Sequence, residues 1–192
     1  MSFISESQLS NYRARTMTFS RDNFVNLNES YSRDKTKPMV FLSHKHDELI
    51  ILHDVIAFLK KEGVDIYIDW MDEEMPAYTN AETAIKLKNR IKISNKFILV
   101  ATQNAINSKW CNWELGLGDA AKYKEHIALF PVNRTYQSFS GAEYLKIYPY
   151  IDYENGNGVY LNGSYIPKGY YVKTPLDNGN LNLVALKDWL RR

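Results

Sequence analysis

The chain has 192 residues, of which 45% are hydrophobic and 24% are charged, a balance typical of one globular domain with extensions. Its formal charge of +2 gives no strong basic field, which argues against nucleic acid as a partner. The single cysteine, Cys111, excludes an internal disulfide framework and a cysteine-based zinc site.

The N-terminal stretch gives no sign of a targeting segment. Residues 1–19 contain no apolar stretch of the kind found in secretory signals, and no apolar run approaches the roughly 20 residues needed to span a bilayer. We therefore expect a cytoplasmic protein with no membrane partner. Residues 1–36 are polar and are interpreted as an N-terminal extension with a short helix over 5–16.

Beyond residue 36, short apolar runs alternate along the chain with segments whose apolar residues have helical spacing. Buried strands are predicted by four short apolar runs, at 38–43, 64–68, 95–101 and 127–132. Helical spacing separates these runs, and helix starts are predicted at Asp47, at Thr79 or Asn80, and at Ser108. Four alternations of strand and helix imply parallel strands with right-handed crossovers, so the expected fold is α/β with a doubly wound parallel sheet.

The C-terminal part departs from this alternation. Residues 148–152 predict a fifth strand, Asn162-Gly163 is typical of a type I′ hairpin turn, and 181–192 predict a terminal helix. The expected organisation is an N-terminal extension followed by one domain, which has a core and a C-terminal elaboration: 1–36, then 37–192, with the core at about 38–152 and the hairpin and helix at about 153–192.

Ligands of doubly wound sheets bind outside the carboxyl ends of the strands. Function is therefore expected in the segments after the first three strands, at 43–47, 69–78 and 102–114. The middle segment is rich in acidic side chains, and the favoured interpretation is a solvated loop that balances the basic helix after it. An aromatic in this segment, such as Tyr78, can stack on a flat ring in the cleft.

The first segment is a polar cluster that contains two histidines. Turn formation and helix capping explain Ser43 and Asp47 about as well as a binding role does. His44 and His46 are candidate metal ligands, but side chains two residues apart point to opposite faces if the strand continues, and no third ligand is evident. We therefore expect no metal site.

The third segment holds Trp110 and Glu114, which share a helix face because they are four residues apart. A carboxylate beside a large aromatic side chain would be partly desolvated and suited to bind positive charge or ribose hydroxyls. The alternative, which spacing alone favours, is a surface glutamate on an amphipathic helix whose tryptophans belong to the core. Cys111 is expected to be buried and inert.

Four segments resemble Toll/interleukin-1 receptor (TIR) domains in order and spacing. Val-Phe-Leu-Ser-His (40–44) is similar to the first conserved box of that family, and Asp-Ile-Tyr-Ile-Asp (65–69) with its acidic loop is similar to the second strand and BB loop. Phe-Ile-Leu-Val-Ala-Thr (97–102) resembles the third strand, and Trp-Cys-Asn-Trp-Glu (110–114) matches the W-x-x-x-E motif of the enzymatically active branch. The resemblance spans about 38–132 and implies a flavodoxin-like fold.

The resemblance also implies a substrate and a site. In the active branch the motif glutamate, here Glu114, is required to cleave NAD+ at the nicotinamide–ribose bond, and Trp110 is its partner in the pocket. NAD+ enters as the substrate, and no cofactor is implied. The further substrate-binding positions that the resemblance implies are Ser43, His44, Lys45 and Tyr78. The BB loop carries Glu-Glu-Met-Pro-Ala in place of the receptor-type Arg-Asp-x-x-Pro-Gly, which favours the bacterial enzymes over receptor adaptors.

The implied chemistry needs few protein groups. Nicotinamide departs neutral from a cationic substrate, so one carboxylate that steadies the ribose cation can suffice. Attack by water gives ADP-ribose, whereas attack by a group of the adenosine half gives a cyclic isomer. Bacterial TIR proteins of this size often act in antiphage defence, including Thoeris systems. The implied partners are therefore NAD+, further copies through TIR–TIR contacts, and a separate effector reached through the product.

Three other interpretations differ in what they require. A non-catalytic TIR interaction module should tolerate Glu114→Ala, whereas an NADase should lose turnover while it stays folded. A nucleoside deoxyribosyltransferase-like enzyme would act on deoxynucleosides and ignore NAD+. A phospho-receiver domain needs an aspartate after the third strand, where this chain has Ala101-Thr102-Gln103, so that interpretation is set aside.

Overall fold

The computed structural model of the protein describes residues 4–12, 36–69, 81–122, 124–133 and 143–192. The strands are β1 Ile4–Ser5, β2 Met39–Ser43, β3 Asp65–Tyr67, β4 Lys96–Ala101, β5 Ile127–Asn133, β6 Tyr150–Glu154, β7 Gly169–Pro175 and β8 Leu181–Ala185. The helices are α1 Glu6–Ser10, α3 Leu49–Lys61, α4 Ala81–Ile93, α5 Gln103–Asn107, α6 Lys109–Ala121 and α7 Leu186–Arg191, with short 3-10 helices at Lys124–His126 and Glu143–Ile147.

The strands form one mostly parallel sheet in the order β3-β2-β4-β5-β6-β7-β8, and β1 pairs separately with β5. All pairs from β3 to β6 are parallel, while β7 and β8 are antiparallel additions at the edge. The first five strands of this path have the flavodoxin-like order 2-1-3-4-5 when renumbered along the chain. The predicted doubly wound α/β fold is therefore confirmed.

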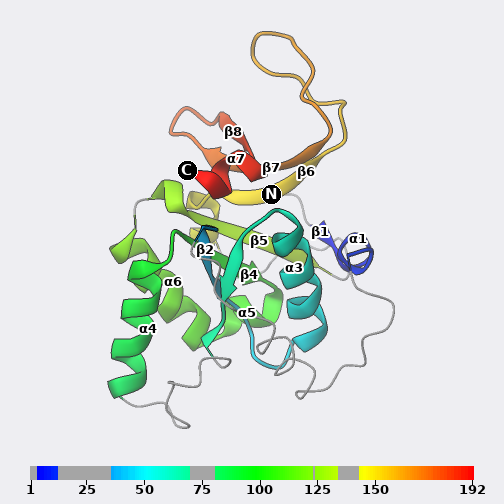
Figure 1. Ribbon diagram of the computed structural model, residues 1–192. Helices are drawn as coiled ribbons and strands as arrows, with labels where there is room; N and C mark the ends of the chain where they lie inside the picture. Colours follow the sequence, from blue (N-terminus) through cyan, green and yellow to red (C-terminus); the bar gives the residue numbers. More distant parts are fainter. Residues whose placement is uncertain (1–3, 13–35, 70–80, 123, 134–142) are drawn as a thin grey trace.

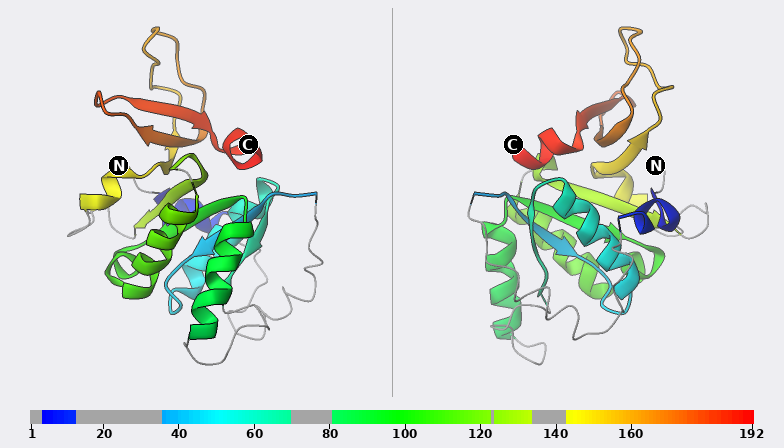
Figure 2. Two further views of the ribbon diagram at one scale, coloured as in Figure 1. Left: turned by 90° about the vertical axis from the view of Figure 1, so that its left-hand side faces the viewer. Right: turned by 45° about the vertical axis from the view of Figure 1, so that its right-hand side comes forward.

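Helices cover both faces of the sheet, and the strands bury alternate residues in the two layers (Figures 1 and 2). In β2, Val40 and Leu42 enter the core beneath α3, whereas Phe41 enters the core beneath α4 and α6. A strand buried on both faces is apolar at most positions, which explains why the short apolar runs of the sequence are central strands. The carboxyl ends of β2 and β4 therefore lie next to each other.

The predicted helix starts hold only in part. The N-cap of α3 is Glu48 rather than Asp47, and its side chain makes no capping hydrogen bond. Ser108 does cap α6, since its hydroxyl accepts from the Cys111 amide at 3.4 Å. The short helix α5 was not predicted; Thr102 caps it by accepting from the Ala105 amide at 3.0 Å. The predicted caps Thr79 and Asn80 lie outside the described residues.

The predicted terminal helix is wrong in its first half. Residues Leu181–Ala185 form β8, and only Leu186–Arg191 are helical. β8 pairs antiparallel with β7, with Val184 opposite Val172. Cross-strand pairing therefore overrides a local pattern that was compatible with either element, and the chain turns to a helix only where Leu186, Trp189 and Leu190 reach the core.

The Asn162-Gly163 turn exists but is not of the predicted type I′. The Gly163 amide donates to the carbonyl of Tyr160 at 2.9 Å, and Gly163 has φ +81°. No other residue type has positive φ in the described chain, whereas a type I′ turn needs positive φ at both central residues. The two arms share a single bridge, Val159 with Tyr165, in a loop that projects from the body between β6 and β7 (Figure 1).

The first described residues pack on the sheet. Ile4 of β1 lies opposite Val132 of β5, and α1 buries Leu9 completely. The Ser5 side chain and Gln8 form a reciprocal capping box at the start of α1, so the helix begins where local chemistry favours it. This helix is shorter than the predicted 5–16 and ends at Ser10. Among the described residues, none of the helices is long and apolar enough to cross a membrane.

Candidate active site

Glu114 lies on the buried face of α6. The inward residues of this helix are Cys111, Glu114, Leu115 and Gly118. Their spacing of three, four and seven residues is that of one helix face, so the glutamate occupies a position where an apolar side chain would be ordinary. Only 2% of Glu114 is exposed. The interpretation of Glu114 as a surface glutamate is therefore wrong.

A serine at the end of β2 meets this carboxyl group. The Ser43 hydroxyl donates to Oε2 of Glu114 at 2.5 Å, and Ser43 is itself 1% exposed. The two residues are 71 positions apart in sequence, and the contact joins the carboxyl end of β2 to α6. A short hydrogen bond to a carboxyl oxygen fixes the position of the group at the ligand-binding edge of the sheet.

Burial controls the charge of this carboxyl group. Removal from water, followed in size by the negative charge of Asp69, raises the pKa of Glu114 to about 8. The hydrogen bond from Ser43 and the nearby Trp110 indole act in the opposite direction and favour the ionised form. At neutral pH the glutamate in the unliganded protein is therefore mostly protonated, so a bound cation can make it ionise.

Trp110 contributes a buried indole N–H beside the Glu114 carboxyl group. Its Nε1 atom is buried and has no hydrogen bond of ordinary geometry within the described chain, although the indole lies close enough to the Glu114 carboxyl group to favour its ionised form. The Trp110 and Trp113 rings lie 5.0 Å apart with an interplanar angle of 33°. A buried donor without an acceptor is uncommon in folded proteins, and a polar substrate group would remove its energetic cost.

His44 follows Ser43 and is also buried, with 3% of its surface exposed. Its Nδ1 lies 3.2 Å from the carbonyl oxygen of Leu42, and burial lowers the pKa of the imidazole to about 4, so the ring is neutral at physiological pH. The Cys111 thiol donates to the carbonyl oxygen of His44 at 3.2 Å. Burial raises the pKa of Cys111 to about 11, which confirms a buried thiol in a structural position.

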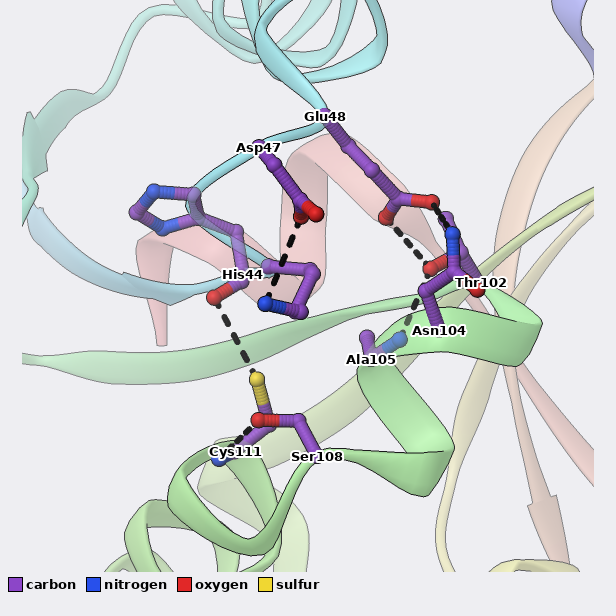
Figure 3. Close-up of polar contacts among 9 residues, drawn as sticks. His44, Asp47, Glu48, Thr102, Asn104, Ala105, Ser108 and Cys111 are labelled. Carbon is purple, nitrogen blue, oxygen red and sulfur yellow. Dashed lines mark hydrogen bonds and ion pairs between the residues drawn. The ribbon is translucent and has the colours of Figure 1, made fainter.

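The loop between β2 and α3, residues 44–48, is fastened to α5 by Glu48 (Figure 3). The Thr102 hydroxyl donates to one carboxylate oxygen of Glu48 at 2.5 Å, and the Asn104 amide donates to the other at 2.9 Å. This use of both oxygens explains why Glu48 does not cap its own helix. On the far side of the same loop, the Cys111 thiol holds the His44 carbonyl, so the loop is fixed at both ends.

Lys45 lies at the rim of this arrangement. Its side chain is about a third exposed and pairs with the exposed Asp47 at 3.4 Å. Its positive charge also reaches the Cys111 thiol, whose pKa it lowers slightly against the effect of burial. A separate groove of about 480 Å³ is lined by Glu48, Thr102 and Asn104, together with parts of α1, α3 and β5. Glu114 does not line that groove.

The structure removes both reasons for expecting no metal site at His44 and His46. β2 ends at Ser43, so the alternation of a strand does not separate His44 from His46. Asp69 supplies the third group that was not recognised: its Oδ2 lies 3.2 Å from Nε2 of His46, and this contact raises the pKa of His46. The carboxyl end of β3 lies beside that of β2, which is the signal that would have placed Asp69 here.

The structure therefore brings four of the predicted site residues together and leaves one at the rim. The four are Ser43, His44, Trp110 and Glu114. Tyr78 lies outside the described residues. Glu48 was missed because its helix was predicted to begin one residue earlier, and nothing in the local pattern links it to α5.

The parallel sheet and the buried carboxyl group at its carboxyl edge define an α/β domain with a candidate ligand site on β2 and α6. The TIR domain family matches this chain over residues 40–160, which include all of α6 and β2 from its second residue on. The chain belongs to the TIR domain family.

Two named relatives are similar to parts of the chain. A protein of Bacillus cereus (strain MSX-D12) named "Probable 3' cyclic ADP-D-ribose synthase ThsB'" is 28% identical over 127 residues, which are 64% of this chain and 64% of that protein. A protein of Cytobacillus dafuensis named "Putative cyclic ADP-D-ribose synthase TIR2" is 29% identical over 79 residues, 40% of this chain and 21% of that protein. The chain thus spans less than two thirds of the first relative and about a fifth of the second.

Glu114→Gln is expected to stabilise the protein in a pH-dependent way. Because the folded-state pKa is about 8 and the ordinary value is 4.5, the folded protein holds the Glu114 proton more tightly than the unfolded chain does. The wild type therefore loses stability relative to the variant as pH rises from 4.5 to about 8, by a few kcal/mol in total, and the difference is constant above that range. Urea unfolding of both proteins at several pH values measures it; parallel stability curves would contradict the buried, protonated carboxyl group.

Glu48→Ala is expected to loosen the loop between β2 and α3. The substitution leaves the Thr102 hydroxyl and the Asn104 amide without their acceptors, so the free energy of unfolding should fall by about 1–2 kcal/mol. Asp47→Ala is the matched control, because this neighbouring carboxylate is exposed and should change stability by less than about 0.5 kcal/mol. Equal effects of the two substitutions in urea unfolding would show that Glu48 does not fasten the loop.

Proposed function

We propose that this chain cleaves NAD+ at the bond between nicotinamide and ribose, with Glu114 as its catalytic carboxylate. One observation carries the proposal: the Glu114 carboxyl group is buried and held at 2.5 Å by Ser43 at the ligand-binding edge of the sheet. Supporting it, two relatives of the chain are named as a probable and a putative cyclic ADP-D-ribose synthase.

The reaction fits a site with one such group. The bond between the ribose carbon and the nicotinamide nitrogen breaks heterolytically, and both electrons leave with the nitrogen, so nicotinamide departs neutral. Positive charge then develops on the ribose ring. A carboxylate in a water-excluded position stabilises that charge strongly, because the local dielectric is low and the group is already oriented.

The raised pKa of Glu114 supports a substrate-dependent charge. A cationic nicotinamide ring in the cleft favours the ionised carboxylate, so binding of NAD+ drives the proton from Glu114 to solvent. The carboxylate is then present only when its electrostatic partner is present. Ser43 holds Oε2 throughout, which leaves the orientation of the group unchanged on ionisation.

The other predicted binding residues have complementary places in this proposal. The Trp110 indole N–H is a buried donor for a substrate oxygen, and its ring forms an apolar wall beside Glu114. The neutral His44 lies next to Ser43 in the chain, with Lys45 at the rim of the site for a diphosphate oxygen. Tyr78 keeps its proposed place as a stacking residue.

Cyclisation is the proposed fate of the ribose cation. A nucleophilic atom of the adenosine half attacks the ribose carbon and loses its proton to solvent, which gives a cyclic ADP-ribose isomer and nicotinamide. Water in its place gives ADP-ribose, so the yield of cyclic product depends on how well the cleft excludes water. The relatives' names support cyclisation. We further propose that the product signals to a separate effector in antiphage defence of the Thoeris type, with TIR–TIR assembly completing the site.

The test compares purified wild type, Glu114→Gln and Glu82→Gln. Each protein is incubated with NAD+, and the release of nicotinamide is measured by chromatography with mass detection. Glu114→Gln keeps the size of the side chain and should lower the rate by about 10³-fold or more, because it removes the charge that stabilises the ribose cation. Glu82→Gln changes an exposed glutamate of α4 and should match the wild type.

The assay includes high protein concentration and a crowding agent, so that assembly is not limiting. A product with the mass of ADP-ribose less one water supports cyclisation, and ADP-ribose itself identifies hydrolysis. Undiminished nicotinamide release by Glu114→Gln would contradict the catalytic role. Absence of release by the wild type under every condition would favour a non-catalytic assembly module.

A further inference from the structure

A histidine, histidine and aspartate cluster lies at the edge of the candidate site. His44, His46 and Asp69 each offer one ligand atom, and these atoms lie within 4.8 Å of one another. The residues come from the carboxyl ends of two neighbouring parallel strands, β2 and β3. The proposed cleavage of NAD+ uses Glu114 and needs none of these three atoms to be close together.

The sheet and its neighbours already orient the three side chains. The His44 and His46 rings lie 5.2 Å apart, and Oδ2 of Asp69 is 3.2 Å from Nε2 of His46. Nδ1 of His44 lies 3.2 Å from the carbonyl oxygen of Leu42, a contact that fixes the ring plane as second-sphere hydrogen bonds do around metal-bound histidines. The Cys111 thiol holds the backbone of the same histidine.

We propose that His44, His46 and Asp69 bind one divalent transition-metal ion of the zinc class. Two imidazoles and one carboxylate form a donor set that zinc binds readily, whereas magnesium and calcium prefer oxygen ligands. Three protein ligands leave a fourth tetrahedral position for water.

Ligand atoms about 2.0–2.1 Å from a tetrahedral zinc ion are roughly 3.4 Å apart, so the widest separation in the cluster must shorten by up to about 1.4 Å. The side chain of His46 is 52% exposed and has room for this movement.

The bound ion would connect two segments that the fold places side by side. The ion would replace the contact between His46 and Asp69 with one bond to each of these side chains. The buried His44 would supply the third ligand. The neighbouring charged groups are Lys45, which pairs with Asp47, and Glu114, which feels the charge of Asp69. Ionised Asp69 would compensate half of the charge of a divalent ion at this cluster.

The experiment measures zinc binding directly and is independent of NAD+ cleavage. The full chain is treated with chelator, desalted and titrated with Zn²⁺ in competition with a chromophoric chelator, and Co²⁺ serves as a spectroscopic probe of coordination. The expected result is one ion per chain at micromolar metal, with a tetrahedral Co²⁺ spectrum. His46→Ala and Asp69→Asn should each weaken binding by about 100-fold or more, since even second-sphere changes cost 10–100-fold.

Two controls separate this site from other zinc-binding groups. Asp47→Asn removes a carboxylate of the same loop that is 71% exposed and outside the cluster, and His126→Gln removes a histidine elsewhere in the fold. Both variants should bind zinc like the wild type. Circular dichroism of His46→Ala and Asp69→Asn checks that they fold. Unchanged affinity in folded His46→Ala, or no stoichiometric binding by the wild type, would overturn the proposal, whatever the outcome of the NAD+ assay.

Discussion

The hydrogen bond from Ser43 to the buried carboxyl group of Glu114 is the contact on which the rest of the site depends. It forms only because α6 lies close to the sheet. Gly118 permits that approach: a Cβ atom there would meet the Phe97 ring of β4 at 3.1 Å. The same closeness removes Glu114 from water. This desolvation keeps the carboxyl group protonated and lowers the stability of the folded protein where the group must ionise. A carboxyl group kept at that cost, in a place suited to a leucine, is the strongest sign of function in the molecule.

The surrounding structure fixes both partners of this contact. Ser43 ends β2, and the loop that follows is held by Cys111 on one side and by the Glu48 carboxylate on the other. The Glu48 side chain makes no capping hydrogen bond to α3 and accepts from Thr102 and Asn104 instead. Preorganisation of this kind suits the proposed stabilisation of a short-lived ribose cation, because the groups need not reorient during such a reaction.

Much of the fold was predictable from the sequence, and the departures have physical causes. The central strands are short apolar runs, so their existence could be predicted, and their carboxyl ends located the segments that hold Ser43 and Glu114. The choice of Glu114 itself came from the resemblance to the W-x-x-x-E motif. Local patterns did not determine β8, because pairing with β7 decides its conformation. The burial of Glu114 was hidden by the two tryptophans, which looked like the core residues of α6. Asp69 and Glu48 act through contacts with other elements, and no motif marks such contacts.

The most direct test of this account is a titration of the Glu114 carboxyl group by carbon-13 NMR, with Glu114→Gln to assign the signal. The account predicts a pKa near 8 in the unliganded protein. It also predicts a lower pKa when a non-cleavable NAD+ analogue, with carbon in place of the ribose ring oxygen, brings its cationic ring to the site. An ordinary pKa near 4.5 in the free protein, or a raised value that the cationic analogue leaves unchanged, would contradict it.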